Sequence, residues 1–103
     1  MNIGCDIVSN QRLRNKSQRF IDLVLTFKEQ EEYKKNGLFY LCGRFAAKEA
    51  IMKALKNTKS YNFLDIEILT DITGQPYCSN LKNIKVSISH EKEMTIAVAI
   101  VIS

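Results

Sequence analysis

The middle of the chain carries an uncharged stripe at helical spacing. Over residues 38–56, one side of a helical projection holds only uncharged residues: Phe39, Tyr40, Ala46, Ala47, Ala50, Ile51 and Ala54. The segment has no proline, and Gly43 is its weakest helix former. We therefore predict a helix from about Leu38 to Lys56. The alanines of the stripe would let this helix lie very close against a sheet.

The other side of this predicted helix mixes charged and large apolar residues. Its charges are Arg44, Lys48, Glu49, Lys53 and Lys56, and they are interleaved with Leu38, Leu41, Phe45 and Met52. An ordinary exposed helix face is polar rather than evenly mixed. We therefore expect this side to form the wall of a cleft or a contact between subunits.

Alternation of apolar and polar residues predicts strands over residues 1–8, 64–70 and 84–89. Residues 94–102 are apolar on both faces, which predicts a central strand or one that another subunit covers. A turn rich in glycine, proline and aspartate separates the second strand from a short return strand that we expect to begin at Tyr77.

Two helices are predicted between the first strand and the central helix. Ser9-Asn10 and Thr26 are favourable N-cap residues, and they predict a basic helix over 11–25 and a shorter one over about 27–35. The order β-α-α-α-β-β-β-β is typical of an α+β fold, with helices packed on one face of a mainly antiparallel sheet. We expect residues 1–103 to form a single domain.

The composition is that of a folded protein, with 46% hydrophobic and 25% charged residues. No apolar run approaches the roughly 18–20 residues of a membrane span, and the N-terminus lacks the apolar core of a signal peptide. The three cysteines have no metal-binding spacing, and there is one histidine. We expect reduced thiols in a cytoplasmic protein, no membrane association and no zinc site.

The net charge is +4, and the basic residues are concentrated in two stretches. Residues 12–19 hold four cations and no acid, and residues 44–59 hold five cations and one acid. Such stretches are typical of proteins with polyanionic partners: a phosphate-bearing ligand, an acidic protein or a nucleic acid. An ordinary solvated surface would have the same composition.

Two acids stand in unfavourable places. Asp6 lies within an otherwise apolar strand, on the same face as Gly4 and Val8, and a buried carboxylate is costly unless it is paired or binds a metal. Asp6 could instead end the strand and cap the next turn. Glu49 is the lone carboxylate among the cations of the central helix.

Three stretches occur in one order and spacing: Gly4 to Val8, Gly43 to Leu55, and Val86 to His90. They match the patterns G-x-D-I, F-x-x-K-E-A-x-x-K-A and S-x-S-H. In these motifs the whole chain resembles the holo-acyl-carrier-protein synthases, the small trimeric branch of the 4'-phosphopantetheinyl transferases. The resemblance implies that family's fold and a homotrimer with active sites at the subunit boundaries.

The resemblance also implies a reaction, in which phosphopantetheine passes from coenzyme A to a serine of apo-acyl carrier protein. Adenosine 3',5'-bisphosphate would be released. Asp6, Glu49 and Lys53 match the family's catalytic residues, and the two acids match its Mg²⁺ ligands, since magnesium uses one or two carboxylates with substrate phosphates. The proton acceptor is left open between Glu49 and a metal-held water. Lys53 could otherwise form only a surface pair with Glu49.

By the same resemblance, coenzyme A would be bound by seven residues: Arg44, Lys48, Lys53, Gly74, Pro76, Ser89 and His90. The less specific interpretation is that Arg44 and Lys48 are solvated cations and that His90 is a turn residue. Gln75 stands where the family usually has a lysine, so a nucleotide contact from that position is not expected in the usual form.

The basic segment after the first strand would bind the acidic carrier protein through Arg12, Arg19 and Phe20. A rival hypothesis is a non-enzymatic basic α+β module that binds nucleic acid through residues 12–19 and 44–59. A third is a purely structural oligomerising domain. Neither gives the two acids a role, and no predicted surface strand has the interleaved aromatics of a base-stacking platform. We therefore expect no nucleic acid among the partners.

Overall fold

The computed structural model describes residues 1–55 and 61–102. Its elements, in chain order, are β1 (Asn2–Ser9), η1 (Asn10–Leu13), α1 (Gln18–Val24), α2 (Phe27–Asn36), α3 (Leu38–Leu55), η2 (Phe63–Asp65), β2 (Ile68–Thr70), β3 (Pro76–Cys78), β4 (Ile84–His90) and β5 (Met94–Val101). The predicted loop over 57–61 lies almost entirely outside the described residues, as do Lys56 and Lys59.

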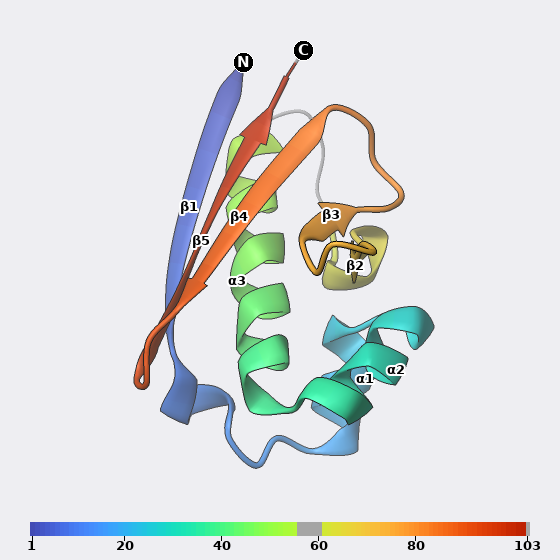
Figure 1. Ribbon diagram of the computed structural model, residues 1–103, viewed down its shortest axis with the longest axis vertical. Coiled ribbons are helices and arrows are strands. Elements are labelled where there is room, and N and C mark those ends of the chain that lie inside the picture. Colours follow the sequence, from blue (N-terminus) through green and yellow to red (C-terminus); the bar gives the residue numbers. More distant parts are fainter. Residues whose placement is uncertain (56–60, 103) are drawn as a thin grey trace.

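Three antiparallel strands form the main sheet, in the order β1-β5-β4 (Figure 1). The doubly apolar segment is therefore the central strand, as predicted. β2 and β3 form a separate antiparallel pair, which confirms the short return strand. The α+β class with a mainly antiparallel sheet is confirmed. None of the helices over the described residues is long and apolar enough to cross a membrane.

α3 packs along one face of the sheet through its alanines. Ala46, Ala47, Ala50 and Ala54 are fully buried, as the uncharged stripe predicted. The approach to β1 is closest at Gly4, where an added Cβ would collide with the carbonyl oxygen of Ala50. Phe39 is the exception to the stripe, because 44% of its surface is exposed.

Much of the second side of α3 is covered by the chain itself, although Arg44 on this side still lines a cleft, which confirms the predicted cleft wall in part. α1, α2, η2 and β2 lie beyond α3 from the sheet (Figure 1). Leu41 and Lys48 are fully buried there, and Arg44 is nearly so. The mixture of charged and apolar residues arises because this side of α3 packs in a second layer that contains buried polar contacts.

The predicted helix over 11–25 is wrong in its first half. A short 3-10 turn follows β1, and Asn15 then adopts a left-handed conformation with φ of 62°, which ends any helix. The helix begins anew after Ser17, whose side chain accepts a hydrogen bond from the amide of Phe20. The second predicted helix is confirmed, with Thr26 and Glu29 forming a capping box.

The predicted strand over 64–70 is also shorter than expected. Asn62 and Asp65 form a reciprocal cap that closes the 3-10 turn η2, so regular pairing begins only at Ile68. Leu64 is 45% exposed as a result. Side-chain hydrogen bonds of Asn and Asp to nearby amides compete with strand pairing, and here they prevail.

Candidate active site

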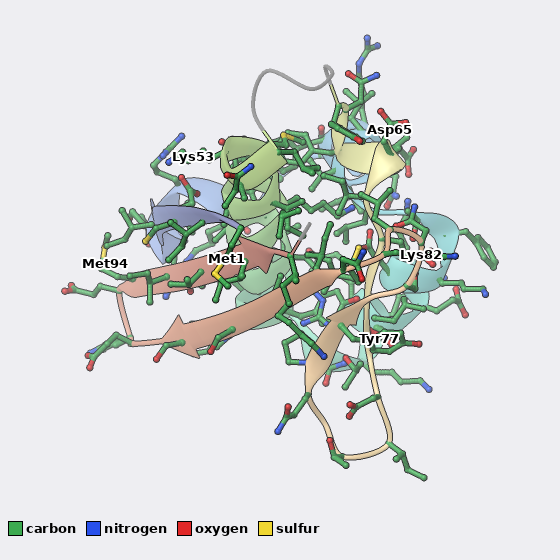
Figure 2. All side chains as sticks on the ribbon, turned by 90° about the horizontal axis from the view of Figure 1, so that it is seen from above. Met1, Lys53, Asp65, Tyr77, Lys82 and Met94 are labelled. Carbon is green, nitrogen blue, oxygen red and sulfur yellow. The ribbon has the colours of Figure 1, made fainter. Side chains whose placement is uncertain are left out.

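Asp6 of β1 meets the C-terminal half of α3. Its carboxylate accepts a hydrogen bond from Lys53 Nζ at 3.1 Å, and the same ammonium donates to the carbonyl oxygen of Cys5 at 2.9 Å. The Asp6 side chain is only 15% exposed, whereas that of Lys53 is 55% exposed. Figure 2 shows Lys53 near the end of α3, on the side of β1. The close packing at Gly4, two residues earlier, brings these groups together.

Glu49 lies one turn before Lys53 on α3 and faces the same place. Its pKa is raised by partial burial and by the negative charge of Asp6, and Lys53 opposes the rise. The two carboxylates therefore sense each other electrostatically, although they are 43 positions apart in the chain. The described residues contain no group of three or more metal-ligating side chains. A pair of acids with one counter-cation nevertheless suits Mg²⁺, which takes one or two carboxylates and completes its shell with phosphate oxygens and water.

A second group of candidate site residues lies around the start of α3. A cleft of about 410 Å³ is lined by Arg44, Phe39, Lys35, Gly74 and His90, among others, so the structure brings three of the predicted ligand-binding residues together. Neither Asp6 nor Glu49 lines this cleft.

Arg44 is held rigidly in that cleft. Its Nε donates to the carbonyl oxygen of Ile68 at 3.0 Å, and a terminal nitrogen donates to Thr70 Oγ1 at 2.7 Å. The guanidinium also lies over the Tyr40 ring and 3.5 Å from a carboxylate oxygen of Glu32. Such a fixed planar cation is well suited to binding an anion at a defined place.

His90 forms another wall of the same cleft. Its ring stacks on Phe39, with centroids 5.5 Å apart, and its Nδ1 lies 2.9 Å from Thr95 Oγ1. Partial burial and the charge of Arg44 lower the pKa of the His90 imidazole. Gly43 leaves room for the ring, because an added Cβ there would crowd its Cε1 edge.

Lys48 is not a ligand-binding residue in this structure, which corrects the sequence prediction. Its side chain is fully buried, and its ammonium donates to Glu29 Oε1 at 2.6 Å and to the carbonyl oxygens of Val24 and Phe63. Burial lowers the pKa of Lys48, and the adjacent Glu29 opposes that shift. All three donor directions of the ammonium are thus used inside the chain.

Two further predicted residues lie apart from the cleft. Ser89 is on the opposite face of β4 from Ile88 and His90, since side chains alternate along a strand. Pro76 and Gln75 line a different cavity of about 460 Å³, between β3 and β4. Ser89 and Pro76 therefore do not line the cleft with His90 in the single chain, and their part in ligand binding stays a prediction.

The predicted carrier-binding residues are divided between two elements. Arg12 lies in η1 and Arg19 in α1, and both are exposed. Phe20 instead packs inward, stacked on Phe45 at 6.2 Å, with the ammonium of Lys16 over its ring. Its aromatic surface is therefore mostly used by the fold.

Sequence reasoning missed three polar residues that are buried in the structure: Asn10, Glu29 and Thr95. Glu29 lies among charged residues in the sequence, yet it is fully buried and binds Lys48. The signal that could have found it is the capping box, in which Thr26 is followed three residues later by a glutamate.

Comparison with known proteins supports the resemblance. A family model described as the 4'-phosphopantetheinyl transferase superfamily matches residues 2–101. The chain belongs to this superfamily. It is 41% identical to the holo-[acyl-carrier-protein] synthase of Mycoplasma capricolum, over 96% of this chain and 92% of that protein. With the synthase of Caldicellulosiruptor saccharolyticus the identity is 40%, over 96% and 94%.

Solved structures of holo-[acyl-carrier-protein] synthases have the same fold. The Bacillus anthracis synthase, in complex with coenzyme A (3',5'-ADP), superposes with a TM-score of 0.86 at 33% identity, over 95% of this chain and 92% of that one. The Helicobacter pylori synthase, in complex with coenzyme A, gives 0.84 at 32% identity, over 96% and 98%. Membership of this transferase family, predicted from three motifs, is confirmed.

The burial of Lys48 generates a stability prediction for this family member. Lys48→Met leaves the Glu29 carboxylate buried without its cation, so we expect a loss of about 3–5 kcal/mol in the free energy of unfolding. The double variant Glu29→Gln/Lys48→Met should recover most of it, because no unpaired charge remains. Urea unfolding measures both.

Lys34→Met is the matched control, since Lys34 pairs with Glu31 on the surface. It should cost at most about 1 kcal/mol. A Lys48→Met variant as stable as this control would contradict the structural role of the buried pair.

Proposed function

We propose that this protein transfers 4'-phosphopantetheine from coenzyme A to a serine of apo-acyl carrier protein in a magnesium-dependent reaction. Adenosine 3',5'-bisphosphate is the second product. The observation that carries the proposal is the convergence of Asp6, Glu49 and Lys53 from β1 and α3. The similarity to synthases solved with coenzyme A supports it. Residues 1–103 act as one catalytic domain, in the cytoplasm.

Asp6 and Glu49 would hold the magnesium ion at the pyrophosphate of coenzyme A. When bound, the ion supplies charge neutralisation at the phosphate being transferred and at the leaving phosphate. Lys53 already lies between the two chain segments and reaches the same region, so its ammonium is available to contact phosphate oxygens. Glu49, or a water held at the metal, would accept the serine proton.

The Arg44–His90 cleft would bind the remaining phosphate and nucleotide portion of coenzyme A. Arg44 and Lys35 supply positive charge there. Gly74 has a φ of 90°, which favours glycine, and without a side chain it would let the ligand come close to the backbone. Lys48, Ser89 and Pro76 are left out of this proposed binding site for the single chain.

A homotrimer would bring together the two groups of site residues, the acids with Lys53 and the Arg44–His90 cleft. The sheet face opposite α3 is strongly apolar, with Ile3 69%, Ile7 58% and Ile96 39% exposed in the single chain. In Figure 1 the other elements lie on the α3 side of the sheet. Large exposed apolar patches mark interaction surfaces. Because the metal-binding acids and the Arg44–His90 cleft do not share a cavity in one chain, a neighbouring copy would complete each active site.

The acyl carrier protein would dock on the basic segment formed by η1 and the start of α1. This segment exposes Arg12, Arg14, Lys16 and Arg19 and carries no acid between residues 12 and 19. Complementary charge steers an acidic partner and sets its orientation.

The first test is direct transfer. Incubation with apo-acyl carrier protein, coenzyme A and Mg²⁺ should add the mass of one phosphopantetheine group to the carrier, as read by mass spectrometry. Removal of the metal with a chelator should stop the transfer, and restored Mg²⁺ should recover it.

A carrier protein whose acceptor serine is replaced by alanine is the matched control, and it should gain no mass. In light scattering, the active preparation should have about three times the 11.8 kDa mass of the chain. Absence of transfer to several apo-carriers, with folded protein and saturating Mg²⁺, would overturn the proposed function.

A second test concerns the carrier surface. Arg12→Ala should raise the KM for the carrier protein and leave the KM for coenzyme A unchanged, since Arg12 lies outside both groups of site residues. The loss should shrink as salt is added, because salt screens exposed charges. An equal rise in both KM values would contradict the assignment. Magnesium-independent, steeply salt-sensitive binding of nucleic acid would instead favour the rival hypothesis.

A further inference from the structure

A buried hydrogen-bond chain leads from the β4–β5 turn to His90. Asn10 Nδ2 donates to the carbonyl oxygens of Glu91 at 2.9 Å and Lys92 at 3.1 Å. Thr95 Oγ1 lies 2.7 Å from Asn10 Oδ1 and 2.9 Å from His90 Nδ1. Asn10 and Thr95 are at most 1% exposed, whereas His90 at the end of the chain of hydrogen bonds is exposed.

The hydrogen bonds between these residues fix the position of each proton in turn. Backbone carbonyl oxygens only accept, so the amide group of Asn10 must present its nitrogen to them and its oxygen to Thr95. That oxygen also only accepts, so the Thr95 hydroxyl proton points toward it. The Thr95 oxygen is then left with a lone pair toward His90, and His90 Nδ1 must carry a hydrogen.

We propose that Thr95 and Asn10 are positioning residues that hold the neutral His90 ring in the tautomer protonated at Nδ1. In this tautomer Nε2 carries a lone pair and cannot donate to an anion. Nε2 becomes a donor only when the ring takes up a second proton and is an imidazolium ion. No hydrogen bond occupies Nε2 within residues 1–55 and 61–102.

The consequence concerns phosphate binding, and it rests on the function proposed above. A phosphate oxygen is an acceptor, so binding it at His90 Nε2 requires the imidazolium form. Arg44 of α3 and Lys35 of α2 face the cleft as cations, and Glu32 and Tyr40 also line it. Burial and Arg44 lower the pKa of His90, so the empty site favours the neutral ring, and anion binding must draw in a proton.

The tautomer is tested first, without any ligand. The chain has a single histidine, so long-range ¹H–¹⁵N NMR correlations report His90 alone. Above the measured pKa of the ring, Nδ1 should be the protonated nitrogen, although free histidine in water favours the opposite tautomer. A wild-type spectrum with the proton on Nε2, or shared between the two nitrogens, would overturn the inference, whatever the variants do.

Two variants at one position separate orientation from packing. Thr95→Val keeps the shape but removes the hydroxyl, so the ring should shift toward the Nε2-protonated tautomer. Thr95→Ser keeps the hydroxyl and should retain the wild-type tautomer. A Thr95→Val spectrum identical to that of the wild type would show that Thr95 does not set the tautomer.

Proton uptake is then measured by calorimetry with adenosine 3',5'-bisphosphate, in buffers of different ionisation heat. One pH unit above the His90 pKa, the wild type should take up about one proton more than His90→Gln, and its affinity should fall about tenfold per further pH unit. Thr95→Val should take up fewer protons, because its neutral ring can donate from Nε2. Equal uptake by all three proteins would overturn the link to binding. Absence of binding by all three would overturn the proposed function and this link, while the NMR spectrum alone decides the tautomer.

Discussion

The close contact between β1 and α3 is the constraint on which the candidate active site depends. Gly4 allows the strand to touch the helix backbone at Ala50, because any side chain there would collide with that carbonyl group. Asp6 follows two residues later on the same strand face, and Glu49 and Lys53 flank Ala50 on the helix. The spacing of small residues therefore determines how near the two carboxylates come. A looser interface would move the two carboxylates apart.

The second layer fixes the orientation of the same helix from its other side. Glu29 accepts hydrogen bonds from the Thr26 amide, the Lys48 ammonium and the Ile68 amide, so a single carboxylate links α2, α3 and β2. Lys48 directly precedes Glu49, and a rotation of α3 about its axis would break the buried pair. Van der Waals contact on one side and charge pairing on the other thus hold α3 in one orientation.

The strands and α3 could be predicted because their patterns are local: two-residue alternation and a helical stripe. Membership of the transferase superfamily could also be predicted, because the motifs are contiguous stretches of sequence. The burial of Lys48 and its pairing with Glu29 could not be predicted. A cation on a mixed helix face contacts either water or a buried acid, and which of the two depends on the elements that pack over it. The 3-10 turn after Asn62 depends on a hydrogen bond from the Asn62 amide to the Asp65 carboxylate, which competes with strand pairing. The left-handed conformation of Asn15 is a local backbone feature that helical periodicity does not signal. Thr95 and Asn10 are 85 positions apart, and only folding joins them.

The most direct measurement is the binding of Mn²⁺, a paramagnetic substitute for Mg²⁺, to the protein with coenzyme A, followed by electron paramagnetic resonance. If Asp6 and Glu49 hold the ion, Asp6→Asn and Glu49→Gln should each weaken its binding by more than the ~10–100-fold typical of an outer partner. Glu31→Gln, a surface control, should bind the ion as the wild type does. Unchanged Mn²⁺ affinity in both site variants would contradict the account, because the two acids would then share no metal.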